Sequence, residues 1–204
     1  MEDKVYFVGD VVALVAADTE EIATEALDLI DVEYEQLEAV FSAEDALKEG
    51  AVEIYPRFKG NHVDNGIKYF QPDGPWWQII RGDVKKGFEE AAYVAEDKVA
   101  FDKMPSPLAP ETPCCIAKYE GGNEYPIWAS SQSAHILKLM GEGRIPHSNL
   151  NVKTFNVGGS YGNKQSLMTT VLSASMLSLV TKRPVKIVLT KEEQLMSYEV
   201  RLGS

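Results

Sequence analysis

The chain has 204 residues, which is enough for one domain or two small ones. Hydrophobic residues make up 45% of it, a share that supports a packed core and argues against a disordered chain. The net charge of −11 repels phosphate backbones and anionic lipids, so we expect neither nucleic acids nor membrane surfaces as partners.

The two cysteines, Cys114 and Cys115, are neighbours, and neighbouring side chains of a strand point to opposite faces. The pair is therefore a poor disulfide and a poor metal clamp, and we expect two reduced thiols in the core. The histidines, at positions 62, 135 and 147, are scattered, so their spacing predicts no metal ion held by protein side chains. The sequence shows no secretory signal and no apolar run of the about 20 residues that span a bilayer, so we expect a cytoplasmic protein.

The first part of the chain predicts a β-α-β unit. Val5–Val8 and Val11–Ala16 are expected to be strands, and Val32–Leu37 alternates apolar and acidic side chains as a half-buried strand does. A helix between them is predicted to begin with a capping box at Asp18. Its apolar residues recur at helical spacing: Ile22, Ala23, Ala26, Leu27 and Ile30.

The middle of the chain has weaker patterns. Phe41–Gly50 predicts a short surface helix. Tyr55–Gly74 contains glycine, proline and asparagine without a sustained period, which favours a linker; the alternative is an irregular but ordered connection. After Trp76 we expect a short helix that carries Val84 and Phe88, and then a strand over Tyr93–Met104.

The last part alternates strands and helices. Prolines keep residues 104–113 extended, and Cys114–Tyr119 and Tyr125–Ala129 are predicted to pair as a hairpin. The elements expected after the hairpin are a helix, a strand, a long apolar helix and a buried strand: Gln132–Met140, Val152–Phe155, Ser166–Val180 and Val185–Leu189. A further element begins at Lys191.

Two short segments are candidates for a binding site. The first is the glycine loop, which we define as Val157–Gln165; it follows a strand and precedes a helix, where bare backbone can approach a ligand or hold an anion. It matches neither a Walker loop nor Gly-x-Gly-x-x-Gly, and taken alone it is explained as well by tight packing of helix on strand. The second is Gln132, whose amide follows a strand end; the alternative is a solvated residue at a helix start.

Together the segments resemble the xanthine dehydrogenase and aldehyde oxidoreductase family of molybdenum hydroxylases. Trp128–Gln132 reads Trp-Ala-Ser-Ser-Gln where the family has Trp-x-Ser-x-Gln. The glycine loop contains Gly-Gly-Ser-Tyr-Gly-Asn-Lys where the family has Gly-Gly-Gly-Phe-Gly-Gly-Lys. Further segments fall in family order: Val8–Ala16, Ala26–Leu37, Arg81–Val84, Pro107–Thr112 and Arg183–Lys186.

The resemblance implies molybdopterin, in a dinucleotide form, with molybdenum held by its dithiolene rather than by side chains. It implies that Gln132 hydrogen-bonds an oxo ligand of the metal and that main chain at Gly159–Gly162 passes close to the metal. The residues that would bind the cofactor are therefore Gln132, Gly158, Gly159, Ser160, Tyr161 and Gly162. Gln132 and Gln165 are the candidate catalytic residues; Gln165 stands where purine-oxidising members carry a glutamate, and an amide does not supply that charge. Ser160, Tyr161, Asn163, Ser106 and Ala109 also depart from common family residues.

For the fold, we expect an α+β chain. Residues 1–56 would form the C-terminal part of a hammerhead-like β-α-β domain, residues 57–75 a linker, and residues 76–204 the N-terminal part of a mixed-sheet molybdopterin-binding domain. The family's molybdenum subunit is several times longer, so the chain is either a fragment or the product of a split gene.

The resemblance implies part of an enzyme that oxidises an aldehyde or an N-heteroaromatic small molecule with water as the oxygen source. Its partners would be the rest of the molybdenum subunit, an iron–sulfur subunit and a flavin subunit carrying FAD. The family's glutamate base has no counterpart here, so we expect the isolated chain to be inactive. Two alternatives remain: a non-catalytic module that binds a pterin or nucleotide, and a structural subunit that packs against partners.

Overall fold

The computed structural model describes residues 4–56, 58–61, 82–99, 107–142, 144–145, 149–165 and 167–197. The chain divides into two compact units, one formed by residues 1–31 and 99–204 and the other by residues 32–98. The predicted linker lies largely outside the described residues, as do residues 100–104 of the predicted strand. Of the described helices, none combines the length and the hydrophobicity that a membrane span requires.

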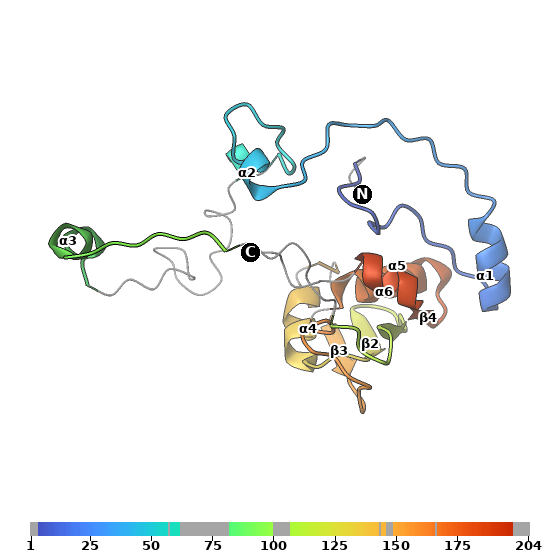
Figure 1. The fold of residues 1–204 in the computed structure, drawn as a ribbon. Coiled ribbons are helices and arrows are strands. Elements are labelled where there is room, and N and C mark those ends of the chain that lie inside the picture. Colours follow the sequence, from blue (N-terminus) through green and yellow to red (C-terminus); the bar gives the residue numbers. More distant parts are fainter. Residues whose placement is uncertain are drawn as a thin grey trace. The chain divides into compact units, whose positions relative to one another are not determined.

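The first unit contains a mixed sheet of four strands in the order β3-β2-β1-β4 (Figure 1). The strands are β1 Cys114–Ala117, β2 Glu124–Ala129, β3 Asn149–Lys153 and β4 Val185–Val188. β1 pairs antiparallel with both β2 and β4, whereas β2 and β3 are parallel. The predicted hairpin is confirmed: Gly121 and Gly122 turn it with φ of 95° and 57°, values that favour glycine.

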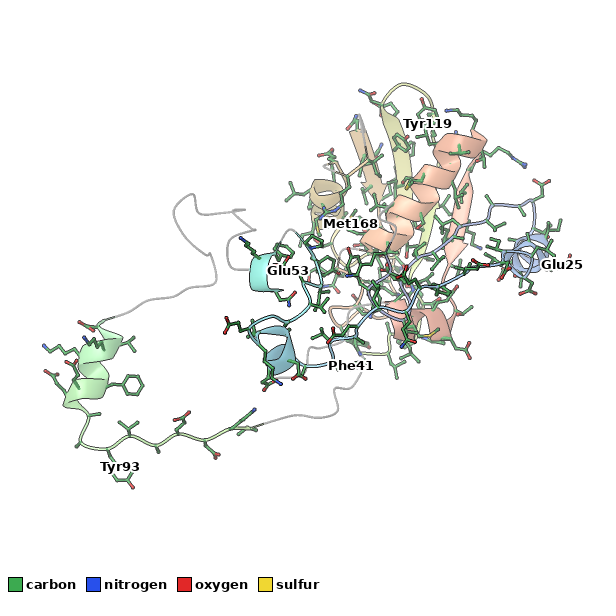
Figure 2. The ribbon with its side chains drawn as sticks, turned by 90° about the horizontal axis from the view of Figure 1, so that it is seen from above. Glu25, Phe41, Glu53, Tyr93, Tyr119 and Met168 are labelled. Atoms are coloured by element: carbon green, nitrogen blue, oxygen red, sulfur yellow. The ribbon has the colours of Figure 1, made fainter. Side chains whose placement is uncertain are left out.

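Helices α4 Ala134–Glu142 and α5 Met168–Thr181 pack against this sheet and against each other. Figure 2 shows α5 lying along the sheet, from Met168 toward Tyr119. The buried apolar residues lie between the sheet and these helices, and they include Cys115, Ala117, Tyr125, Ile127, Leu137, Leu150, Val171 and Ala174. Buried small side chains let α5 approach the strands closely: Ser173, Ala174, Ser175 and Ser178. The expected α+β class with a mixed sheet is confirmed.

The N-terminal segment of the first unit contains α1 Glu20–Leu27. Its cap is Thr19, one residue later than predicted, because the Thr19 hydroxyl reaches the N–H of Ile22 at 3.3 Å. The strands predicted at Val5–Val8 and Val11–Ala16 are wrong. Residues 11–17 are extended but belong to no ladder, and a turn closes where the N–H of Asp10 donates to the carbonyl of Phe7.

The described residues of the second unit form three short helices, α2 Ala43–Ala46, η1 Lys59–Asn61 and α3 Val84–Glu90. The side chain of Asn61 donates to the carbonyls of Ala46 and Val52 and accepts from the N–H of Ile54. The strand predicted over Val32–Leu37 is extended chain here, as are the described residues 93–99 of the other predicted strand. Alternating side chains create a strand only where a neighbouring strand takes the backbone hydrogen bonds, and no described residue provides one.

Candidate functional site

The two candidate segments leave the sheet at the same edge. β2 and β3 run parallel, and Trp128 lies opposite Lys153 in the register. β2 therefore ends directly before Ser130–Gln132, and β3 ends shortly before the glycine loop. Both segments follow the carboxyl ends of neighbouring strands. Such ends are where ligands commonly bind in sheets with parallel strands.

Gln132 is hydrogen-bonded directly to the glycine loop. Its side-chain Oε1 accepts from the N–H of Gly162 at 3.2 Å and from the hydroxyl of Ser160. Its own N–H donates to the carbonyl of Lys164 at 3.1 Å. The buried hydroxyl of Ser131 donates to the same carbonyl at 3.2 Å. Gln132 and the glycine loop are thus in direct contact through Ser160 and Gly162.

These contacts fix the direction of the Gln132 amide. A backbone N–H can only donate, so the atom that faces Gly162 is the acceptor oxygen Oε1. No described residue accepts a hydrogen bond from the donor Nε2 of Gln132. Gln132 is also solvent-exposed. The arrangement presents one oriented, unused donor beside the loop.

The loop turns sharply at Tyr161-Gly162. The N–H of Asn163 donates to the carbonyl of Ser160 at 3.0 Å, and both central residues have positive φ, 56° at Tyr161 and 96° at Gly162. Positive φ at both central positions is typical of a type I′ turn, which rarely holds an aromatic residue at its first central position. A Cβ placed on Gly162 would meet nothing within 4 Å, so bare backbone faces open space.

The ring of Tyr161 lies over Gly159. A Cβ placed on Gly159 would come within 3.2 Å of the ring carbon Cε2 and 3.3 Å of the hydroxyl oxygen. Tyr161 is 68% exposed, so its hydroxyl can reach water and needs no buried partner. Gln165 is exposed as well, and only its carbonyl joins the hydrogen bonds of the site, accepting from Ser131 at 3.5 Å.

Glu111 is a member of the site that the sequence reasoning missed. It exchanges two hydrogen bonds with Gly158: its N–H donates to the Gly158 carbonyl, and its Oε2 accepts from the Gly158 N–H, each at 3.1 Å. The same Oε2 lies 2.6 Å from Nζ of Lys164, whose side chain is fully buried. The hydrogen bond from Lys164, helped by that from Gly158, lowers the pKa of Glu111 below its ordinary value of 4.5.

The depressed pKa predicts an acid-sensitive contribution to folding. The ionised Glu111 stabilises the folded chain fully above pH 4.5, and this contribution is lost as the pH falls through the lower folded-state pKa. The difference in unfolding free energy between wild type and Glu111→Gln should therefore shrink as the pH falls below 4.5 in denaturant titrations. The other carboxylates are the same in both proteins, so their titration cancels in this difference. A difference in unfolding free energy that stays constant with pH would contradict the assignment.

A second set of polar contacts joins α6, Lys191–Ser197, to the glycine loop and to the segment just before Glu111. Gln194 is 1% exposed, and its Nε2 donates to Oδ1 of Asn163 at 3.1 Å. Nζ of Lys191 donates to Oε1 of Gln194 at 3.2 Å and to the carbonyl of Ala109. Two of the departures from the family pattern, Ala109 and Asn163, are thus tied to the same helix. Local patterns gave no signal for Gln194, because its partner is distant in sequence.

Two family models match this chain. The model of the molybdopterin cofactor-binding domain matches residues 67–202, and that of the aldehyde oxidase and xanthine dehydrogenase a/b hammerhead domain matches residues 1–38. The chain is 33% identical to a probable xanthine dehydrogenase subunit of Bacillus subtilis (strain 168) over 199 residues, 96% of this chain. It is 29% identical to the nicotinate dehydrogenase large molybdopterin subunit of Eubacterium barkeri over 195 residues, 95% of this chain.

Solved structures of similar fold include quinoline 2-oxidoreductase from Pseudomonas putida 86, with a TM-score of 0.65, 23% identity and coverage of 90% of this chain and 22% of the other. Aldehyde oxidoreductase from Desulfovibrio gigas gives a TM-score of 0.62 and 20% identity, covering 92% of this chain and 19% of the other. The chain spans only part of its curated relatives, 25% of the Bacillus protein and 42% of the Eubacterium protein.

Proposed function

Because the chain belongs to the family of molybdopterin-binding subunits of xanthine dehydrogenases and aldehyde oxidoreductases, we propose that Gln132 and the glycine loop form one wall of a molybdopterin site. The observation that carries the proposal is the orientation of the Gln132 amide. The N–H of Gly162 donates to Oε1 of Gln132, and this leaves Nε2 as the hydrogen-bond donor of the side chain. The wall is built at the carboxyl ends of β2 and β3.

The residues present fit this cofactor. A molybdenum–oxygen ligand is a hydrogen-bond acceptor, and Gln132 offers a donor that no described residue uses. The dithiolene end needs close approach of main chain, and the open side of Gly162 gives that approach without a side chain in the way. The cofactor's own chelate holds the metal, so this wall needs no cluster of metal-ligating side chains.

Each residue of the wall then has a distinct role. Gln132 donates through Nε2 to a ligand oxygen of the cofactor. Main chain at Gly162 supplies a close approach with no side chain in the way, and the exposed ring of Tyr161 covers Gly159. Gln165 stands on the substrate side as a neutral hydrogen-bonding group, so we propose substrates whose recognition there needs no carboxylate.

When bound, the cofactor would supply hydroxylation of an aldehyde or N-heteroaromatic carbon with oxygen from water, and it would take up the two electrons released. We propose a dinucleotide form of the cofactor. The remaining walls and the base would come from the rest of the molybdenum subunit, and the electrons would pass to iron–sulfur and flavin centres on partners. The two free thiols, one of them buried, suit a reducing cytoplasm.

The test is binding of molybdopterin by variants of Gln132. Loss of a hydrogen bond to a strongly polarised group costs about 1.5–3 kcal/mol, so Gln132→Ala should weaken binding by roughly tenfold or more. Gln132→Glu keeps an acceptor for the N–H of Gly162 but has no donor, so it should bind as poorly as Gln132→Ala. Affinity is measured anaerobically by the fluorescence of pterin that is released and oxidised after equilibrium with the chain.

The matched control is Gln36→Ala, which removes another exposed glutamine amide. Wild type and this control should bind alike. Failure of the wild-type chain to bind would remove the proposal. Equal binding by Gln132→Glu and wild type would show that the donor role of Nε2 is wrong.

A further inference from the structure

We propose that Glu111 and Lys164 are positioning residues whose ion pair holds the glycine loop in the bent form that receives the cofactor. The inference deepens the proposed function and rests on it. Neither residue needs to touch the cofactor. Lys164 is fully buried, whereas Gly162, the open point of the loop, is exposed.

The first support is the burial of a charge. The Lys164 side chain is 0% exposed, and Glu111 is its ion-pair partner. Every other ion pair among the described residues joins two side chains that are each at least 38% exposed. A buried ammonium without a carboxylate is strongly unfavourable, so the loop keeps Lys164 in this position only while Glu111 faces it.

The second support is the geometry of one carboxylate oxygen. Oε2 of Glu111 accepts from Nζ of Lys164 at 2.6 Å and from the N–H of Gly158 at 3.1 Å. Gly158 begins the bend of the glycine loop and Lys164 ends it, so one atom ties the two ends together. Ser160, Tyr161 and Gly162, the part that contacts Gln132 or carries the turn, lie between the tied ends.

The third support is the fit between Glu111 and Gly158. A Cβ on Gly158 would lie 2.7 Å from Cβ of Glu111, a distance that real contacts do not show. Only glycine therefore allows the carboxylate-bearing segment to come this close. The hydrogen bond from the N–H of Glu111 to the carbonyl of Gly158, and the one from the N–H of Gly158 to the Glu111 carboxylate, fix how the two residues face each other. The carboxylate is consequently held by Gly158 as well as by Lys164.

Stability alone does not explain this pair. Replacing a buried ion pair with apolar groups of similar volume is often neutral or stabilising. Apolar groups cannot form directional hydrogen bonds. They would not accept a hydrogen bond from the N–H of Gly158, and they would not fix the spacing of the two ends of the loop. The ion pair is therefore assigned to loop geometry.

The experiment compares Lys164→Met with the double variant Glu111→Gln/Lys164→Met and with Ser178→Ala. Ser178 is also fully buried; its Oγ accepts from the N–H of Tyr119 and donates to the carbonyl of Arg183, away from the glycine loop. Ser178→Ala is the control for general loss of stability. The double variant leaves no buried unpaired charge, so it tests the inference if Lys164→Met folds poorly.

Two quantities are measured on each full-length chain. One is hydrogen–deuterium exchange of the amides in residues 157–165, without cofactor. Loss of the tie should speed exchange there by about tenfold or more in both Lys164 variants but not in Ser178→Ala. The other is the dissociation constant for molybdopterin, which should rise about tenfold in the Lys164 variants and stay near wild type in Ser178→Ala.

The outcomes separate this inference from the proposed function. If wild type does not bind molybdopterin, the proposed function fails, and faster loop exchange in the Lys164 variants still supports the tie. If wild type binds and the double variant matches Ser178→Ala in both exchange and affinity, the positioning role is overturned. If exchange in the loop stays at the wild-type rate in both Lys164 variants, it is overturned whatever the binding result.

Discussion

Replacing Gly162 with alanine is expected to weaken molybdopterin binding by about tenfold while the chain stays folded. The φ of 96° at Gly162 costs an alanine about 1–2 kcal/mol, which the folded chain can absorb. The added methyl group meets nothing in the protein and projects into the open space beside the loop. It therefore occupies the side from which the cofactor is proposed to approach. Binding is measured as for the Gln132 variants.

Gly121 provides a closely matched control. Its φ is 95°, and a Cβ there also meets nothing within 4 Å, but it lies in the hairpin turn between β1 and β2. Gly121→Ala should show a similar loss of unfolding free energy and unchanged affinity for the cofactor. Equal affinities of the two variants would show that the open side of Gly162 is not where the cofactor binds.

Replacing Gly141 with valine is expected to lower the unfolding free energy by about 1–3 kcal/mol. Gly141 is buried in α4, and a Cβ there would lie 2.4 Å from Cδ1 of Leu150 on β3. Leu150 is 0% exposed, so its side chain cannot turn away into solvent. Helix and strand must separate, and the melting temperature should fall by roughly 2–4 °C for each kcal/mol.

Gly87 is the corresponding control, because it is an exposed helical glycine in α3 and a Cβ added there would meet nothing within 4 Å. Gly87→Val should leave thermal unfolding of the chain unchanged. A melting temperature for Gly141→Val equal to wild type would mean that α4 and β3 are not in close contact.

The elements after residue 113 could be predicted from sequence because each has a strong local signal. Two apolar runs separated by Gly121-Gly122 predicted the hairpin, and the long apolar run became α5. The ends differ by a few residues: the helix predicted from Gln132 begins at Ala134, because Gln132 is engaged with the loop and stays outside it. The pairing of β4 beside β1 was not predictable, because strand order is set by contacts between distant segments.

The strands of the first 40 residues show the opposite case. Val32–Leu37 does alternate apolar and acidic side chains, but alternation reports only which side chains face one side. A ladder also needs a second backbone at hydrogen-bonding distance, and no described residue gives Val11–Ala16 or Val32–Leu37 such a neighbour. The strands predicted there are therefore wrong for the described residues.

The candidate site was partly predictable. Gln132 and the glycine loop were found through two motifs that resemble one family, and the structure places them in hydrogen-bonding contact. Glu111 and Gln194 were missed because their partners Lys164 and Asn163 lie 53 and 31 residues away in the chain. In the sequence alone, Glu111 and Gln194 look like ordinary surface residues. Only the folded structure shows that their partners Lys164 and Asn163 are buried. The catalytic or binding role of every one of these residues stays a prediction.

The position of β4 in the sheet has a consequence for synthesis on the ribosome. β1 is complete early, yet the neighbour on its second edge, Val185–Val188, is made only after α5. Until then the backbone of Cys114–Ala117 has one unsatisfied edge, and its apolar residues favour pairing with any extended chain nearby. The nascent polypeptide thus passes through a period in which a chaperone, or a neighbouring copy on the same messenger, competes with β4 for this edge.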